Sequence, residues 1–419
     1  MPYHVLINEA TFGKAADYLD KLKGNPSLAG KYLRVALQGV DLSRLSVEEF
    51  LDHLIRTKRY RVFANLEVDY HPKADWSLVE AGILADIAVT MDVEAYDNGR
   101  HRDPQVHPEP LALNLTFIPG PVLGTGNGAM TPDMKECIVA GRIDQESYYQ
   151  LIERRFLPYF VEVNECAGRK GRDAFMPIPG VGCGEFAGKF KEEIHTRFQH
   201  ALQELLRQHG DKFPHIKAVY YDSFDKCEPR DEQINGTMFH TVALKHPQSR
   251  NPQPQLCHPR DYLDGRYANC DSYLTVAWDG CSMPGNEAHV GRRETDDGVK
   301  GLATNAMSVM SGGLAGEYDA ESFRYLPTGR NQGKTWEVCF KERNIHLSMA
   351  SAKVYTYDGQ LQTLRDFEAG SGYAVIPSDQ PIFVPRVERP VQMPVFSSVQ
   401  QGVQKPAADE ASSKPCLVM

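Results

Sequence analysis

The sequence predicts an α/β fold, in which apolar strands alternate with amphipathic helices. Residues 174–222 read as a strand, a glycine-rich loop, a helix and a second strand. Residues 271–305 read as another strand, a loop and a helix, and the first 85 residues alternate in the same manner. With 419 residues and 42% hydrophobic content, the chain is long enough for one large elaborated domain or two ordinary ones.

Composition argues against several classes of protein. The net charge of −9 and the lack of a basic block disfavour nucleic-acid binding. The first residues, MPYHVLINEATFGK, contain no basic region followed by an apolar one, so no usual secretory signal is expected. No run reaches the ~20 apolar residues of a membrane span. The nine cysteines include no C-x-x-C pair, which fits reduced cytosolic thiols better than a disulfide framework or a zinc site.

Residues 1–105 are expected to form an N-terminal α/β extension. Ser46 followed by Glu49 is a capping box that marks a helix start, and the polar residues 98–110 are the best candidate boundary. Asp97-Asn98-Gly99 is a turn signal. The expected elements are a helix at 13–23, a strand at 32–40, a helix at 41–58, a strand at 60–68 and a helix at 75–85.

Residues 106–395 are expected to form the main domain, followed by a disordered tail over residues 396–419. The segment PGPVLGTGNGAMTPDMKE is either a mobile loop near a ligand or an exposed linker. Residues 223–262 read as an insertion or surface loop. The other expected elements are a strand at 111–118, a helix at about 145–160, strands at 335–340 and 352–357, and a hairpin turn at 357–359.

The central unit has the physical character of a phosphate site. An apolar strand at 174–178 runs into Pro179-Gly180 and a glycine-rich loop, and an amphipathic helix closed by Gly210 follows before the strand at 216–221. Glycines and a helix start expose backbone N–H groups to an anion. The alternative is a tight turn whose glycines only serve the backbone shape. Cys183 is either a nucleophile or a small residue filling that turn, and the second role is favoured because no partner histidine motif is evident.

The second unit places several carboxylates at a strand end, on a loop and at a helix start, namely Asp271, Asp279, Glu287, Asp296 and Asp297. Ligands of open α/β sheets bind at the carboxyl ends of strands, where carboxylates accept hydrogen bonds from ribose, activate water or hold a divalent metal. A functional role is favoured for Asp279. Asp296 is also a plausible helix N-cap with Asp297 beside it, and Asp271 is also a plausible turn residue. His289, Arg292 and Arg293 either meet a diphosphate or face water.

Together these motifs resemble the macrodomain, the ADP-ribose-binding α/β/α fold. FMPIPGVGCGEFAG, its helix and KAVYYDSFD resemble the phosphate-loop half of that fold. TVAWDGCSMPGNE…TDDGVKGLAT resembles the variant found in bacterial effector ADP-ribosylhydrolases of the MavL kind. The resemblance covers roughly residues 110–345. It implies a macrodomain-like three-layer α/β/α sandwich with a mixed central sheet.

The resemblance also implies hydrolysis of mono-ADP-ribose from modified protein side chains. It assigns catalysis to Asp279, Asp271 and Glu287. It assigns ligand binding to Gly182, Cys183, Gly184, Glu185, Phe186, Asn286, Asp296 and Asp297. Phe186 either stacks on the ribose or packs under the loop. Glu287 stands where related proteins have aspartate, and the polymer-processing glycine motif is missing, so removal of a single unit is expected. The expected ligand is ADP-ribose, and no cofactor is firmly assigned. A magnesium-dependent hydrolase is a further alternative, because Asp296 and Asp297 carry oxygen ligands suited to Mg²⁺.

The chain ends in Cys416-Leu417-Val418-Met419, a C-a-a-X pattern that predicts farnesylation of Cys416 by a host prenyltransferase. One lipid without a polybasic patch gives marginal, reversible membrane attachment. The expected location is therefore the cytosolic face of a host membrane or the cytoplasm, after secretion from a bacterium without a classical signal peptide. The expected partner is an ADP-ribosylated protein, and the alternatives are a non-catalytic ADP-ribose reader or a prenylated scaffold for host proteins.

Overall fold

The computed structural model describes residues 2–62, 74–125, 128–242 and 253–371. They belong to one compact unit built on a ten-stranded sheet. Across the sheet the strands are β14 (Leu361–Thr363), β13 (Ala352–Tyr355), β1 (His4–Asn8), β2 (Ala88–Asp97), β3 (Val106–Pro119), β10 (Cys270–Trp278), β6 (Asp173–Pro179), β7 (Ile216–Asp222), β9 (Thr237–Val242) and β8 (Arg230–Ile234). β3, β10, β6, β7 and β9 run parallel, and β2 and β8 run antiparallel to their neighbours, so the sheet is mixed.

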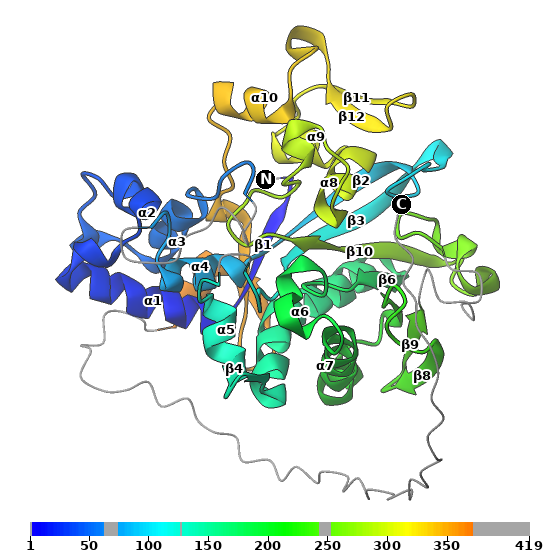
Figure 1. The fold of residues 1–419 in the computed structure, drawn as a ribbon, viewed down its shortest axis with the longest axis horizontal. Helices are drawn as coiled ribbons and strands as arrows, with labels where there is room; N and C mark the ends of the chain where they lie inside the picture. The colour runs from blue at the N-terminus through cyan, green and yellow to red at the C-terminus, as the bar shows by residue number, and fades with distance from the viewer. Residues whose placement is uncertain (1, 63–73, 126–127, 243–252, 372–419) are drawn as a thin grey trace, which may run out of the picture. The chain divides into compact units, whose positions relative to one another are not determined.

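Helices cover both faces of this sheet. The helices are α1 (Glu9–Gly24), α2 (Lys31–Ala36), α3 (Val47–Ile55), α4 (Leu78–Ala85), α5 (Pro132–Cys137), α6 (Gln145–Lys170), α7 (Ile194–His209), α8 (Asp296–Ala303), α9 (Ala306–Met310), α10 (Trp336–Glu342) and α11 (Leu364–Gly370). α6 and α7 lie below the sheet in Figure 1, and α8 and α9 lie above it. The short pairs β4 (Ile138–Val139) with β5 (Arg142–Ile143), and β11 (Gly316–Asp319) with β12 (Arg324–Pro327), stand apart from the sheet.

Alternating side chains of the strands build the two cores. On β6, Met176 and Ile178 pack in the cluster under α6 and α7, whereas Phe175 points into a cluster on the other face. On β10, Val276 and Trp278 join the large cluster that contains residues of α1, α3, α8 and α9. This alternation is the period of two that strands buried on both faces show. The expected three-layer α/β/α sandwich is therefore confirmed.

The first 105 residues share the central sheet with the rest of the chain. β1 pairs with β13 near the other end of the sequence, and β2 pairs with β1 and β3. α1 to α4 form a helical group at one side of the sheet (Figure 1). The predicted boundary near residue 105 falls between β2 and β3, which are hydrogen-bonded along most of their length.

Most expected elements are present, but three segments were assigned wrongly. The predicted strand at 32–40 is helix α2, in which Leu33 is buried and Val35 is 67% exposed. The predicted strand at 335–340 is helix α10, in which Trp336, Cys339 and Phe340 are buried at helical spacing. Residues 223–262 contain the hairpin β8–β9, whose Asn235-Gly236 turn has positive φ at both residues, as a type I′ turn requires.

One further expectation is confirmed, and others lie partly or wholly outside the described residues. The capping box of α3 is confirmed, since Ser46 Oγ accepts from Glu49 N and Glu49 accepts from Ser46 N. Most of the expected strand at 60–68 and all of the expected tail at 396–419, including Cys416, lie outside the described residues. No helix in the described part of the chain combines the length and apolar character needed to cross a membrane.

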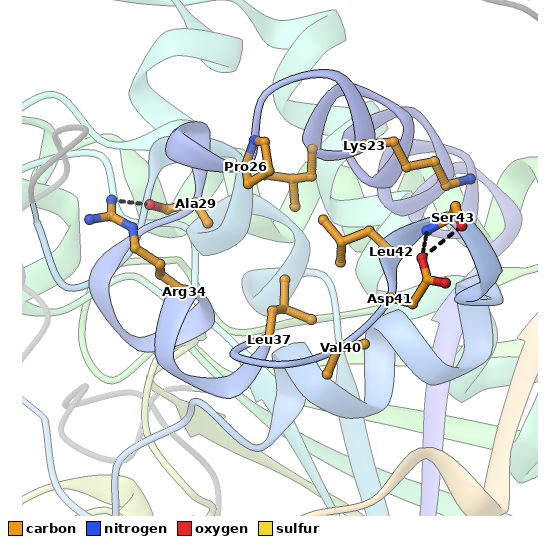
Figure 2. Close-up of a pocket in the computed structure, with 10 residues that line it drawn as sticks. Lys23, Pro26, Ala29, Arg34, Leu37, Val40, Asp41, Leu42 and Ser43 are labelled. Atoms are coloured by element: carbon orange, nitrogen blue, oxygen red, sulfur yellow. Dashed lines mark hydrogen bonds between the residues drawn. The ribbon is translucent and has the colours of Figure 1, made fainter.

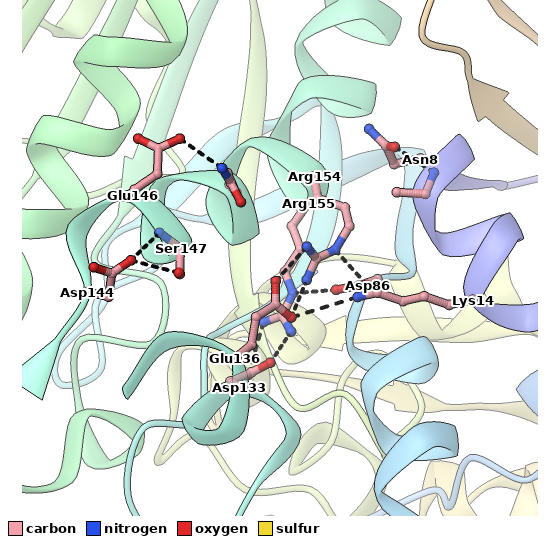
Figure 3. Close-up of polar contacts among 12 residues, drawn as sticks. Asn8, Lys14, Asp86, Asp133, Glu136, Asp144, Glu146, Ser147, Arg154 and Arg155 are labelled. Atoms are coloured by element: carbon pink, nitrogen blue, oxygen red, sulfur yellow. Dashed lines mark hydrogen bonds and ion pairs between the residues drawn. The ribbon is translucent and has the colours of Figure 1, made fainter. Parts of the chain in front are cut away.

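A buried ionic network joins α1, the end of α4, α5 and α6 (Figure 3). Asp86, at the end of α4, accepts from Arg154 Nε at 2.8 Å and Arg155 Nε at 3.1 Å, and pairs with Lys14 Nζ at 2.9 Å. Arg155 Nη2 donates to Asp133 Oδ1 at 2.6 Å. Asp86 is fully buried, and although burial acts to raise the pKa of its carboxyl, the surrounding cations lower that pKa far below its ordinary value.

Replacing Asp86 with asparagine should destabilise the protein severely, because two buried guanidinium groups lose their shared counter-charge. We expect Asp86→Asn to lower the free energy of unfolding by about 3–5 kcal/mol in urea titrations. Asp20→Asn is the matched control: Asp20 pairs with Lys23 at 2.9 Å but is one-third exposed, so its loss should cost less than about 1 kcal/mol. Equal effects of the two substitutions would contradict a structural role for the network.

Candidate functional site

The predicted site residues gather where parallel strands end. β3, β10 and β6 end at Pro119, Trp278 and Pro179, at the same end of the sheet. This carboxyl end of the parallel strands is called the edge below. β10 pairs with β6 only over Cys270–Ser272 and pairs with β3 from Tyr273 onward, so the β10–β6 ladder ends well before this edge. Ligands of open α/β sheets bind at such a strand edge.

After Ser272, where β10 stops pairing with β6, side chains form hydrogen bonds with backbone groups of β10. The Tyr159 hydroxyl of α6 donates to Tyr273 O at 2.9 Å. Asp296 Oδ2 accepts from Ala277 N at 2.9 Å, and its other oxygen is ion-paired with Lys300. Buried backbone groups need partners, so these contacts stabilise the part of β10 that leads to the edge.

Two glycine-containing loops touch at this edge. Gly120 N donates to Trp278 O at 3.0 Å, which ties the loop after β3 to the end of β10. A Cβ atom added to Gly120 would lie 2.6 Å from Gly182 N, and one added to Gly182 would lie 2.6 Å from Pro121 Cδ. Leu123 N also donates to Phe186 O at 2.7 Å. The loop after β3 is therefore packed against the loop after β6.

The loop after β6 does not run directly into α7. Residues Glu185–Phe190 form a short 3-10 helix, and α7 begins at Ile194, later than the apolar pattern indicated. Gly188 interrupts the helix with φ 54°, and an added Cβ there would lie 2.7 Å from Gly124 Cα. The predicted phosphate loop thus stands before a 3-10 turn instead of before the N-terminus of α7.

Three successive backbone donors lie at the start of that turn. Among the described residues, no acceptor is recorded for the N–H groups of Gly184, Glu185 and Phe186. Gly184 is exposed, and a Cβ atom added there would meet nothing within 4 Å. Successive unpaired N–H groups form a concave site for an anion. The backbone of the predicted ligand residues therefore has the polarity that a phosphate needs.

The side chains of Cys183, Glu185 and Phe186 pack in the core or form an ion pair within the loop. Cys183 is 3% exposed in the core under α6 and α7, and burial raises the pKa of its thiol far above the ordinary value. The Glu185 carboxylate is exposed and pairs with Lys191 at 3.0 Å. Phe186 packs half-buried against the core cluster on the α8 side. A buried thiol of this kind is inert, so Cys183 is not arranged as a nucleophile.

Asp279 directly follows β10 and is partly exposed at the edge. Asn286 Nδ2 donates to its Oδ2 at 2.6 Å. The same amide donates to Val62 O at 2.6 Å and accepts from Val62 N at 2.8 Å, and it is 1% exposed. Asn286, which was expected to contact ligand, thus holds Asp279 and the backbone at residue 62.

Three neighbouring carboxylates hold backbone donors. Asp297 is buried and accepts from Gly285 N at 2.7 Å and Asn286 N at 2.8 Å. Glu287 is 1% exposed and accepts from Thr295 N at 2.8 Å. Asp296 accepts from β10, as described above. The N-cap of α8 is Thr295, whose hydroxyl accepts from Gly298 N, so the interpretation of Asp296 as an N-cap is wrong.

Asp271 lies far from this group. It stands at the start of β10, where it accepts from Arg172 Nε at 2.5 Å. Eight residues of strand separate it from Asp279, about 26 Å at the usual rise of a strand. The expected grouping of Asp271 with Asp279 and Glu287 therefore does not occur, because the two ends of one strand reach opposite edges of the sheet.

Other predicted or candidate groups also lie apart from the edge. His289 packs between Tyr60 and Phe340, and burial lowers its pKa to about 3. Arg293 donates to both oxygens of Asp97. In the described ranges no three His, Cys, Asp or Glu side chains are arranged to hold a metal ion, and the Mg²⁺ variant stays a prediction.

Two pockets in the described part of the chain lie elsewhere. One of about 410 Å³ is formed by α1, α2 and the segment 40–43, as Figure 2 shows. The other, of about 480 Å³, lies beside β11 and β12. None of the predicted site residues lines either pocket.

Sequence reasoning did not place the segment that follows α3 beside the site. Arg59 N donates to Cys281 O at 3.0 Å, and Met283 N donates to Arg59 O at 2.6 Å. Together with the Val62–Asn286 contacts, these bonds lay residues 59–62 along the loop that carries Asp279. The segment is more than 200 residues away in sequence, and no local pattern indicates the contact.

An alanine at position 182 should loosen the contact between the two loops. Gly182 has φ 75°, and its Cβ would clash with Pro121, so Gly182→Ala should lower the free energy of unfolding by about 1–3 kcal/mol. Gly24→Ala, at a position with open space, should be neutral or slightly stabilising when measured by the same urea titration. A neutral Gly182→Ala would show that the loops do not require this close approach.

Asp297 should make stability depend on pH. Burial raises the pKa of its carboxyl well above the ordinary value, and the charges of Asp279 and Asp296 add to this, whereas the two backbone donors oppose it. A group whose pKa is raised by folding stabilises fully below its unfolded pKa, about 3.9, and that contribution is lost as the pH rises toward the folded value. In wild type, this loss lowers the free energy of unfolding by up to about 1.4 kcal/mol for each pH unit above the unfolded pKa. We expect Asp297→Asn to remove that decline. Equal slopes for variant and wild type would contradict protonation of Asp297 in the folded protein.

Comparison with known proteins identifies the family. An ADP-ribosylarginine hydrolase of Drosophila melanogaster, CG3568, is 25% identical to this chain over 154 residues, which cover 33% of the chain. The match spans 27% of the length of that relative. The family described as macrodomain effector MavL matches residues 3–330, which include both loops and all the carboxylates described above. The chain therefore belongs to the MavL macrodomain effector family.

Proposed function

We propose that this protein binds ADP-ribose at the carboxyl edge of its sheet and hydrolyses the bond between a single ADP-ribose and a protein side chain. One contact carries the proposal: Gly120 N donates to Trp278 O while Gly120 packs on Gly182. That contact brings the loop after β6, whose N–H groups at residues 184–186 have no recorded acceptor in the described part of the chain, beside the residue that precedes Asp279. A phosphate-binding backbone and a carboxylate at one strand edge are the parts that the reaction needs.

The diphosphate is proposed to bind the N–H groups of Gly184, Glu185 and Phe186. These donors stand at consecutive positions of a folded turn, so little backbone freedom would be lost on binding. The ribose attached to the substrate then extends toward the end of β10. Asp279 is the partly exposed carboxylate that directly follows β10, and Asn286 Nδ2 donates to its Oδ2. Glu287, Asp296 and Asp297 accept from backbone N–H groups.

Asp279 is proposed to act on the anomeric carbon of that ribose. Its carboxylate either accepts a proton from the attacking water or stabilises the positive charge of the oxocarbenium-like transition state. The water oxygen forms the new bond to carbon, the glycosidic bond breaks with its electron pair, and the leaving side chain takes a proton. The Drosophila relative is an ADP-ribosylarginine hydrolase, so the nitrogen of an arginine is the leaving atom that we propose first.

The family description as effectors supports action on proteins of a host cell. Farnesylation of Cys416 and membrane attachment belong to this proposal on the basis of the sequence alone. The alternatives are an ADP-ribose reader without turnover and a scaffold without ligand.

Calorimetry with ADP-ribose and a release assay on ADP-ribosylarginine protein test the proposal together. Asp279→Asn removes the charge but keeps the size, so it should bind ADP-ribose within a few-fold of wild type and release it about 10²–10⁴-fold more slowly. Asp271→Asn is the matched control, because it removes a carboxylate from the opposite end of the same strand. It should leave both measurements unchanged.

Each other outcome assigns a different function. Binding by wild type without release from any linkage would make the protein a reader. Failure of folded wild type to bind, with and without magnesium, would rule out both reader and hydrolase. Equal rates for Asp279→Asn and wild type would remove Asp279 from the mechanism.

A further inference from the structure

Lys58 is a buried cation next to the loop that carries Asp279. The residue is 2% exposed and lies three positions after the end of α3. Its Nζ donates to Gly280 O and, at 3.2 Å, to Leu84 O. The same nitrogen lies 4.3 Å from the centre of the Trp278 ring. Lys58 therefore contacts the residue before Asp279 and the residue after it.

This arrangement opposes stability. No carboxylate in the described residues lies within 4.0 Å of the Lys58 ammonium, so two carbonyl oxygens and an aromatic face take the place of an ion pair. Removing an ammonium group from water without an ionic partner costs several kcal/mol. Burial accordingly lowers the pKa of Lys58 to about 7, although the nearby Cys281 and Asp279 oppose that shift. A methionine or leucine would fill the same space without this cost.

The contacts of Lys58 are directed at the turn from β10 into the site. Trp278 ends β10, and Gly280 begins the loop that returns to Asn286. The backbone at Arg59 continues the same contact through Cys281 and Met283. Lys58 holds the turn from within the protein, while Asn286 orients the Asp279 carboxylate through its side chain.

We propose that Lys58 is a positioning residue for the hydrolysis of ADP-ribosylated protein: it fixes the Trp278–Gly280 turn and thereby the direction of the Asp279 carboxylate. The inference rests on the proposed function. It adds a residue of the N-terminal helical group to the machinery of a site whose other parts follow β3, β6 and β10. Displacement of a reacting group by about 1 Å can slow an enzyme about 100-fold, so a small shift of this turn suffices.

Lys58→Met tests this role, because it keeps an unbranched side chain, one atom shorter, and removes the charge. We expect a melting temperature close to that of wild type, since removal of the buried charge offsets the loss of the hydrogen bonds to Gly280 O and Leu84 O. The Kd for ADP-ribose should stay within about three-fold, because the phosphate loop is untouched, while kcat for release should fall about 10- to 100-fold. Lys353→Met is the control. Lys353 on β13 forms an ion pair with Glu162 on α6, and its replacement should leave kcat unchanged.

The split between stability, Kd and kcat separates positioning from a merely structural role. Wild-type kcat in a folded Lys58→Met variant would overturn the inference and leave the proposed function intact. Parallel loss of melting temperature, ADP-ribose binding and kcat would also overturn it, since Lys58 would then only support the fold. If Lys58→Met does not fold, Lys58→Arg, which retains the cation over Trp278, must bind ADP-ribose and keep more than about one-tenth of the wild-type kcat. Absence of release by wild type would refute the proposed function and this role with it.

Discussion

The position of the candidate site depends on the buried ion pair between Arg155 and Asp133. Asp133 Oδ2 also accepts from Val122 N at 2.8 Å, and Arg155 lies 3.4 Å from Pro119 O. The pair thus holds both the end of β3 and the loop that follows it. That loop packs on the glycines after β6 and donates to the end of β10, so the separation of the two halves of the site is set by one charge network under the sheet. An apolar core could fill this space, but it would offer no hydrogen bonds to the loop backbone.

A second constraint comes from the short ladder between β10 and β6. Parallel strands that remain paired to their ends leave no room between their last residues. Here pairing with β6 stops at Ser272, and β10 continues beside β3 while Tyr159 and Asp296 bond to two of its backbone groups. Several polar residues near the edge are therefore explained by the backbone alone. The number of carboxylates near this edge is therefore a poor guide to which of them could act in catalysis. The hydrogen-bond partners of each carboxylate are a better guide.

Local sequence patterns predicted the elements that carry the site. The strand at 174–178, the glycine loop and the strand before Trp278 were found because apolar runs bounded by glycine and proline report local structure. α2 and α10 were mistaken for strands because short apolar runs do not distinguish the two periods. β1 and β2 were missed, and their place in the sheet depends on pairing with distant strands.

The same limit applies to the site. The sequence singled out Asp279 from its strand-end position. The family resemblance grouped Asp271 with it, although Asp271 stands at the start of the same strand and therefore at the opposite end of the sheet. Lys58, Val62 and Arg155 were missed for a different reason. A lysine after a helix usually faces water, and only the packed tertiary structure shows that this one does not.

The bonding of Asp297 also alters how an anion meets this edge. By formal charge, four side chains around the end of β10 are negative, namely Asp279, Glu287, Asp296 and Asp297. Burial raises the pKa of Asp297 and so disfavours its negative charge, and the Lys300 ammonium offsets that of Asp296. A diphosphate therefore approaches a surface with far less repulsion than its composition implies. For the ligand proposed above, this charge balance would speed the approach of a doubly charged diphosphate and would leave Asp279 as a carboxylate near the ribose.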